Sequence, residues 1–252
     1  IIKMLKIHKA KKYNNNKEIV KFYNEFGFIC IKNYIAKKSL MSIKVDINRE
    51  SKRRFDKNFD EVIPYLNKVN KKKLYLFNRL ISSLHSLKAL NLELAKFNKV
   101  LFPKKNIFCI ADSILLSLPK NKRLTYDFHQ DTHYVRNFKD ILNIHYPIFF
   151  KSEYNNGSMS VLSKSHKEGP LKYIIKRKSK NSRTNLIPIG INKIKEKYEE
   201  ILLELEVGDV AFFHKDLIHK SNFNFTNRTR TVGLGRYTSS MGNFDIIKSE
   251  DL

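Results

Sequence analysis

His129, Asp131 and His219 have the residue types and the spacing of a metal site. In an extended strand, the side chains at positions i and i+2 project to the same face, so an imidazole nitrogen of His129 and a carboxylate oxygen of Asp131 can reach one ion. His219 follows an apolar run at residues 210–213 and would add a second imidazole from a distant strand. Two histidines and one carboxylate bind Fe(II) on one face and leave positions open for substrate and O₂. The pattern therefore predicts a facial triad suited to oxygen chemistry.

Arg230 supplies a second feature of the same chemistry. It follows His219 by eleven residues and opens a predicted strand at residues 231–237. A planar guanidinium holds a carboxylate through two parallel hydrogen bonds, which suits the far end of a dicarboxylate co-substrate. A His-x-Asp pair alone is weak evidence in a chain with 8 His and 24 acidic residues. Its combination with a distal histidine and an arginine is much more specific.

The elements that must position these residues change in character along the chain. Residues 18–26 have apolar side chains at helical spacing and precede Gly27, which favours the end of a helix there. Residues 84–101 contain no Gly or Pro and predict a long helix. The N-terminal part, residues 1–106, is therefore predicted to be mostly helical, with a short strand at residues 28–31.

From residue 107 onward the sequence is typical of a β-protein. Short apolar runs alternate with polar turns, and Asn155-Asn156-Gly157 is a strong turn signal. Several short strands without alternating helices favour an antiparallel sandwich, jelly roll or barrel. Residues 164–198 are polar and basic and are expected to form a long loop with a little helix. The predicted strands are residues 107–118, 141–150, 158–162, 210–213 and 231–237.

In this order, the motifs resemble the phytanoyl-CoA dioxygenase (PhyH-like) family. The resemblance rests on His129-x-Asp131, on residues 156–169, on Gly208-Asp209, on His219-x-Ser221 and on Arg230, and it runs from about residue 17 to residue 238. Its N-terminal part fits as well, since residues 22–29 look like the family's opening helix, glycine and strand. The family consists of non-haem Fe(II)- and 2-oxoglutarate-dependent oxygenases, so the resemblance implies a mainly β fold with N-terminal helices, a double-stranded β-helix (jelly roll, cupin-like).

The resemblance also implies roles for individual residues. His129, Asp131 and His219 would hold Fe(II), Arg230 would pair with the distal carboxylate of 2-oxoglutarate, and Ser221 would add a hydrogen bond to it. O₂ would be the oxidant, with ascorbate as a reductant in vitro. Halogenating relatives replace the carboxylate ligand by a small residue, so Asp131 favours hydroxylation. Desaturation and epimerisation use the same ligands and stay open as alternatives.

Two departures from the family pattern concern the pocket. The family's Pro-Gly-Ser-His turn is Ser-Lys-Ser-His at residues 163–166, and the usual Trp in the strand after the acid motif is missing, because the chain has no Trp. His145 or Tyr146 stands in that region and is predicted to wall the co-substrate pocket.

His133 and Tyr134 are interpreted as residues of the substrate pocket. His133 is disfavoured as a third local ligand, because positions i and i+4 of a strand lie roughly 13 Å apart. His166 is interpreted as structural. The alternatives left open are His214 for His219, Arg228 for Arg230, and Arg236 as a group of either the pocket or the surface.

The net charge of +25 is concentrated in two blocks. Residues 1–106 carry 26 basic and 8 acidic side chains, and residues 164–198 carry 11 and 2. The excess is mostly Lys, with many Asn and Ile, as in an AT-rich coding background, whereas nucleic-acid readers rely on Arg. We therefore expect no nucleic-acid partner, and a positive rim that favours a small anionic substrate. The competing hypothesis is a catalytically silent basic jelly roll that binds an anionic partner.

The remaining expectations concern organisation and compartment. The whole chain, residues 1–252, is predicted to be a single oxygenase domain, with a helical part (1–106), a jelly-roll core (107–238) and a tail (239–252). No apolar run approaches the ~20 residues that span a bilayer, and no secretory signal is recognised. Cys30 and Cys109 form no disulfide framework, which favours a cytoplasmic location. No motif specifies the substrate or the oligomeric state.

Overall fold

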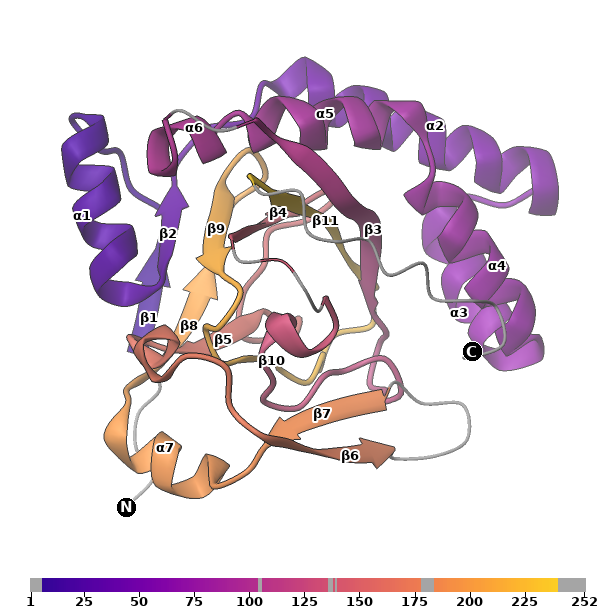
Figure 1. Ribbon diagram of the computed structural model, residues 1–252. Coiled ribbons are helices and arrows are strands. Elements are labelled where there is room, and N and C mark those ends of the chain that lie inside the picture. Colours follow the sequence, from indigo (N-terminus) through magenta and orange to yellow (C-terminus); the bar gives the residue numbers. More distant parts are fainter. Residues whose placement is uncertain (1–5, 104–105, 136–137, 139, 178–183, 240–252) are drawn as a thin grey trace.

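Two β-sheets face each other and form the scaffold of the protein (Figure 1). The computed structural model describes residues 6–103, 106–135, 138, 140–177 and 184–239. The five-stranded sheet is antiparallel throughout and has the order β2 (Phe28–Ile31), β9 (Val210–His214), β4 (Ile141–Pro147), β11 (Arg230–Thr238) and β3 (Phe108–Ser117). The four-stranded sheet has the order β1 (Lys6–Lys9), β8 (Glu200–Glu204), β5 (Met159–Leu162) and β10 (His219–Ser221), in which β1 pairs with β8 in parallel.

Apolar side chains from both sheets fill the space between them. Each strand turns alternate residues inward, so the interior is built from pairs such as Phe28 and Cys30 of β2 and Met159 and Val161 of β5. The predicted jelly-roll architecture is confirmed, although the two sheets are not closed into a barrel.

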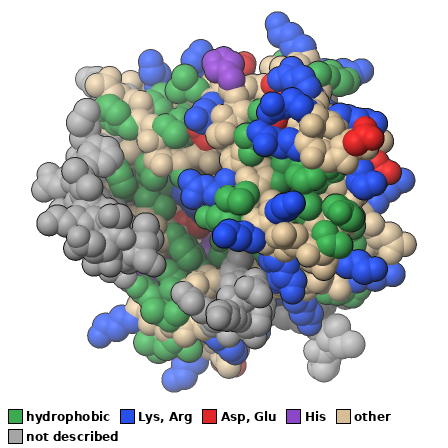
Figure 2. Space-filling model, turned by 90° about the vertical axis from the view of Figure 1, so that its right-hand side faces the viewer, with side chains coloured by type: hydrophobic (Ala, Val, Ile, Leu, Met, Phe, Trp, Pro, Cys, Tyr) green, Lys and Arg blue, Asp and Glu red, His purple; other side chains and the backbone are tan. Residues whose placement is uncertain are grey.

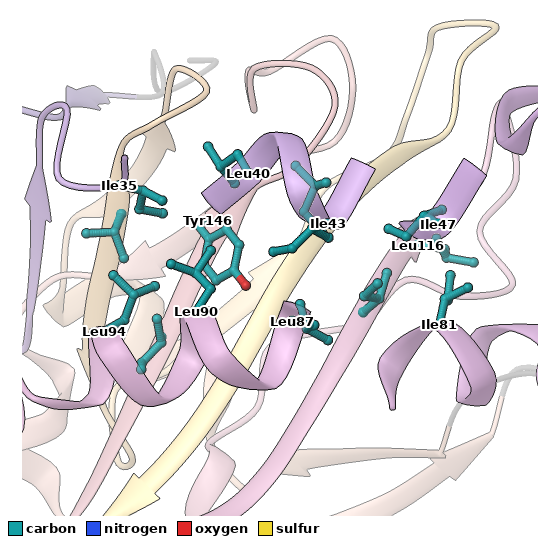
Figure 3. Close-up of a cluster of buried hydrophobic side chains, with 14 of the residues drawn as sticks. Ile35, Leu40, Ile43, Ile47, Ile81, Leu87, Leu90, Leu94, Leu116 and Tyr146 are labelled. Carbon is teal, nitrogen blue, oxygen red and sulfur yellow. The ribbon is translucent and has the colours of Figure 1, made fainter. Parts of the chain in front are cut away.

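Helices cover the outer face of the five-stranded sheet (Figure 1). They are α2 (Lys37–Phe55), α3 (Phe59–Val69), α4 (Lys71–Ser82), α5 (His85–Ala95) and α6 (Asn98–Leu101). The first helix, α1 (Asn16–Phe26), lies beside the edge strand β2 (Figure 1). Leu87, Leu90 and Leu94 lie on one face of α5 and pack towards the sheet, close to Tyr146 of β4 (Figure 3). α1 ends at Gly27, as predicted, and the φ of 82° at this glycine is one that other residues rarely adopt.

Three sequence-based expectations differ from the structure. The predicted helix at residues 84–101 is two helices, α5 and α6, joined by a turn. The expected loop at residues 164–198 contains a 3₁₀ turn η2 (Ser165–Glu168), a hairpin of β6 (Tyr173–Arg177) and β7 (Thr184–Pro188), and α7 (Ile191–Lys197). This hairpin is a separate two-stranded sheet with exposed Ile174 and Ile175, so it has no apolar alternation that a sequence pattern would reveal.

The third difference lies at the metal motif itself. Residues 129–133 do not form a strand: His129 makes a single bridge, and residues Asp131–His133 form a 3₁₀ turn, η1. The predicted tail lies outside the described residues, except for Ser239. Among the described helices, none is both long enough and apolar enough to cross a membrane.

Candidate active site

His129 and His219 are brought together by the backbone. The N–H of each donates to the carbonyl oxygen of the other at 3.0 Å, so His129 forms an isolated antiparallel β-bridge with His219 of β10. The two imidazole rings lie 4.2 Å apart between their centroids. Asp131 follows as the first residue of η1. Its Oδ1 lies 3.8 Å from His129 Nε2, and its Oδ2 lies 3.9 Å from His219 Nε2. All three ligand atoms are within 4.8 Å of one another, so one metal ion can reach them together.

Both imidazoles are held with the same nitrogen facing Asp131. His129 Nδ1 lies 2.7 Å from the carbonyl oxygen of Asp127, and His219 Nδ1 lies 2.9 Å from that of Leu217. A carbonyl can only accept, so Nδ1 carries the proton and Nε2 keeps its lone pair, which is the form that binds metals. Burial lowers the pKa of His129 to about 3 and also lowers that of His219, so both rings are neutral at physiological pH.

Asp131 is a buried carboxylate with two different oxygens. Burial by itself would raise its pKa, but the charge of Arg236, together with its hydrogen bond, holds the pKa at about 2. Oδ1 accepts a hydrogen bond of 2.8 Å from Nη2 of Arg236, whereas Oδ2 has no hydrogen-bond partner in the described part of the chain. A buried ionised oxygen without a donor is costly. A cation bound by Oδ2 and the two Nε2 atoms would remove this cost, so the donor set fits a metal.

A cavity of about 200 Å³ adjoins the three ligands. Ser221 lines it from β10, and Arg230 lines it from β11. Arg230 donates from Nε to the carbonyl oxygen of Asn156 at 3.2 Å and from Nη2 to that of Gly157 at 2.8 Å. Its Nη1 is buried and lacks a hydrogen-bond partner within the described ranges. Burial lowers the pKa of Arg230 to about 10, so the group stays positively charged at neutral pH. It is a fixed cation with a free donor, which is suited to a carboxylate.

His145 and Tyr146 lie on opposite faces of β4, because neighbouring side chains of a strand alternate. His145 faces the cavity, and its buried Nε2 makes no hydrogen bond to any described group. Tyr146 points the other way, into the helical layer (Figure 3). Its hydroxyl donates to Asn91 Oδ1 of α5 at 2.9 Å. Of this pair, only His145 lines the cavity, and Tyr146 belongs to the helix–sheet interface.

His133 and Tyr134 do not line the cavity in the described structure. The turn η1 directs His133 towards Tyr173 of β6, with ring centroids 4.5 Å apart. The Tyr134 hydroxyl donates to the carbonyl oxygen of Thr184 and accepts from the Leu186 N–H, which ties η1 to β7. These residues link the metal motif to the β6–β7 hairpin.

His214 and Arg228, the alternatives to His219 and Arg230, do not line the cavity in the described structure. His166 and His214 approach each other outside the cavity, with ring centroids 5.4 Å apart, and Arg228 lies over the ring of Phe150. Arg236, by contrast, lines the cavity. Its position six residues after Arg230 in one strand was a signal for this placement, because an even spacing in a strand means the same face.

Comparisons with known proteins agree with this geometry. The sequence profile of the family "Phytanoyl-CoA dioxygenase (PhyH)" matches residues 23–232. A search of curated proteins by sequence finds no match.

Several solved structures have a similar fold. The epimerase SnoN, crystallised with Fe³⁺, alpha-ketoglutarate and nogalamycin RO, is 12% identical with a TM-score of 0.62, over 89% of this chain and 83% of that one. EctD from S. alaskensis, with 2-oxoglutarate and 5-hydroxyectoine, is 13% identical with a TM-score of 0.59, over 92% and 80%. The carbocyclase SnoK from nogalamycin biosynthesis is 15% identical with a TM-score of 0.61, over 90% and 85%.

Proposed function

The chain belongs to the phytanoyl-CoA dioxygenase family of non-haem Fe(II)- and 2-oxoglutarate-dependent oxygenases, and on this basis we propose that it hydroxylates a small anionic molecule at the site described above. The resemblance seen in the sequence is thereby confirmed.

His129, Asp131 and His219 are the proposed metal ligands. The observation that carries the proposal is the buried Asp131 Oδ2, which has no hydrogen-bond donor among the described residues while two Nε2 atoms converge on the same carboxylate. Bound Fe(II) would supply the activation of O₂ at this point. The protein contributes by fixing both imidazoles through Asp127 and Leu217, so that the ligands are in place before the metal arrives.

Arg230 is the proposed partner of the distal carboxylate of 2-oxoglutarate. Its guanidinium is held by two backbone carbonyls, and Nη1 remains available for the co-substrate in a buried setting. Ser221 and His145 line the same cavity and are proposed as further polar contacts. His133 and Tyr134 are proposed to act indirectly, by holding the β6–β7 hairpin near the site.

The proposed substrate is a small molecule with a carboxylate or phosphate group. Lys220 and Arg236 line the cavity together with Arg230. Lys220 is paired with Glu200 at 2.6 Å and Arg236 with Asp131 at 2.8 Å, so the proposal rests mainly on the wider surface charge. On the face shown in Figure 2, Lys and Arg side chains outnumber Asp and Glu and border a hollow in which acidic and histidine side chains are visible. A positive surface raises the local concentration of anions and their rate of entry.

The proposed outcome is hydroxylation rather than halogenation, because halogenating relatives have a small residue where this chain has the carboxylate of Asp131. The solved structures with this fold include an epimerase and a carbocyclase, which are other outcomes on the same scaffold. The identity of the product distinguishes them from hydroxylation. We also propose that residues 1–252 act as one oxygenase domain. The proposed compartment is the reducing cytoplasm, since Cys30 and Cys109 are free thiols.

The test is the formation of succinate from 2-oxoglutarate by the purified protein with Fe(II), ascorbate and O₂. A library of anionic metabolites is then screened for a mass increase of one oxygen atom. We expect succinate formation that requires Fe(II) and is stimulated by the true substrate. A protein that takes up no iron but binds polyanions in a steeply salt-dependent manner would support the silent jelly roll instead.

A further inference from the structure

We propose that Arg236 is a positioning residue that gives the two carboxylate oxygens of Asp131 different roles. Arg236 occupies Oδ1 with a hydrogen bond and leaves Oδ2 as the oxygen through which Asp131 binds the metal. The inference rests on the proposed metal site and deepens it, because it assigns a role to a residue that neither the motif nor the family comparison singles out.

The contact between the two groups is close and sheltered. Nη2 of Arg236 donates to Asp131 Oδ1 at 2.8 Å, and the Asp131 side chain is 1% exposed while that of Arg236 is 21% exposed. A charge-assisted hydrogen bond in such surroundings is much stronger than one between exposed groups. Oδ2 of the same carboxylate receives no hydrogen bond from the described residues and lies 3.9 Å from His219 Nε2. Oδ1 lies 3.8 Å from His129 Nε2, so both oxygens border the site and the hydrogen bond from Arg236 is what distinguishes them.

The sheet fixes where the guanidinium can reach. Arg236 lies in the middle of β11's pairing with β4, opposite Asn143, and on the same strand face as Arg230. β11 therefore presents two cations, Arg230 and Arg236, to the cavity beside the metal ligands. Arg230 faces the proposed co-substrate end, and Arg236 contacts the ligand carboxylate.

A carboxylate can bind a metal through one oxygen or through both. If Asp131 used both, it would occupy one of the positions that a facial triad leaves free for co-substrate and O₂. The hydrogen bond from Arg236 makes Oδ1 a poorer ligand and fixes the rotation of the carboxyl group. Residues that orient a metal ligand in this way typically change metal affinity by about 10- to 100-fold when they are replaced.

The experiment compares R236Q and R236K with the wild type, and uses R228Q as the matched control. Arg228 is a nearby arginine that stacks on Phe150 and does not line the cavity. Each protein is titrated with Mn(II), an O₂-stable substitute for Fe(II), and the anaerobic Fe(II)–2-oxoglutarate complex is followed by its visible absorption band. Circular dichroism confirms that each variant is folded.

We expect R236Q to bind Mn(II) about 10- to 100-fold more weakly than the wild type. We expect R236K, whose single ammonium keeps a charge but not the planar fork, to lie between them with a shifted absorption band. In the D131N background, R236Q should weaken binding no further, because the two residues act through one contact. Mn(II) affinities and absorption bands of R236Q and R236K equal to those of R228Q would overturn the assignment. A wild type that binds neither metal would instead overturn the proposed function itself.

Discussion

Arg230 and Gly157 lie in contact across the rim of the site, with Nη2 of the arginine 2.8 Å from the carbonyl oxygen of the glycine. The sequence marked Asn155-Asn156-Gly157 only as a turn between two strands. In the structure, this turn directs two consecutive carbonyl groups at Arg230 and leaves Nη1 for a ligand. This turn, in the connection from β4 of one sheet to β5 of the other, thus prepares the proposed co-substrate site.

Replacement of Gly157 by Ala should weaken 2-oxoglutarate binding without affecting the metal. Gly157 has a φ of 80°, and an added Cβ would lie 2.6 Å from the carbonyl oxygen of Asn222, so the turn must shift. We expect the KM for 2-oxoglutarate to rise by about 10-fold, equivalent to ~1.4 kcal/mol, while Mn(II) affinity is unchanged. G169A is the matched control, because Gly169 also has a positive φ but has open space where its Cβ would lie. Equal KM values in the two variants would contradict the role of the turn.

Arg230→Gln should affect the co-substrate more strongly than Gly157→Ala does. The change removes the buried charge that faces the proposed carboxylate, and the loss of one partner of a buried charge pair costs about 2–5 kcal/mol. We therefore expect the KM for 2-oxoglutarate to rise on the order of 100-fold, with Mn(II) binding within a factor of two of the wild type. The assignment of Arg230 would be wrong if R228Q raised this KM and R230Q did not.

Tyr146→Phe should reduce stability and leave catalysis intact. The change deletes the hydroxyl that donates to Asn91, a buried hydrogen bond worth about 1 kcal/mol. Urea unfolding measures the loss, and steady-state kinetics with 2-oxoglutarate provides the comparison. A raised KM with unchanged stability would mean that Tyr146, rather than His145, faces the co-substrate.

His145 should make the metal-free protein sensitive to acid. Burial, with smaller contributions from Arg230 and His219, lowers its pKa to about 3 from 6.5. The ring is neutral when folded and takes up a proton on unfolding below pH 6.5, so stability falls as the pH drops from about 6.5 towards 3. One such proton corresponds to a slope of about 1.4 kcal/mol per pH unit.

In His145→Leu, the free energy of unfolding should depend less steeply on pH between pH 6 and pH 4 than in the wild type. Urea unfolding after removal of metals by a chelator measures this dependence. The exposed His85 provides the control variant, His85→Leu. If H145L and H85L depended on pH alike, the buried neutral imidazole would not be the source of the acid sensitivity.

The sequence predicted much of the fold and the core of the site because these depend on strong local signals. Apolar runs identified β3, β4, β5, β9 and β11, and the termination of α1 followed from Gly27. The three ligand residues could be named because their types and order are specific, although the strand expected at residues 129–133 is a 3₁₀ turn. Asp131 reaches the histidines because His129 bridges His219 of β10 and the Thr132 N–H donates to the carbonyl oxygen of Lys215, and no local pattern encodes these contacts.

Other features depend on contacts between distant segments and could not be predicted from local patterns. The β6–β7 hairpin has exposed apolar residues and so lacks the alternation of a half-buried sheet. The choice between His145 and Tyr146 depended on the register of β4 with β11, which decides the face of each side chain. The pairing of Arg236 with Asp131 joins residues on β11 and η1, and sequence spacing alone gave only the shared face with Arg230.

The most direct test of the central claim is single-turnover formation of succinate with one equivalent of Fe(II), alongside Mn(II) titration of the same proteins. The account predicts that the wild type binds one Mn(II) and converts 2-oxoglutarate to succinate only when Fe(II) is present. It predicts that Asp131→Ala and His219→Ala stay folded, lose tight Mn(II) binding and form no succinate above background, whereas His214→Ala behaves like the wild type. Unchanged succinate formation in Asp131→Ala or His219→Ala would contradict the assignment of these residues as the metal site.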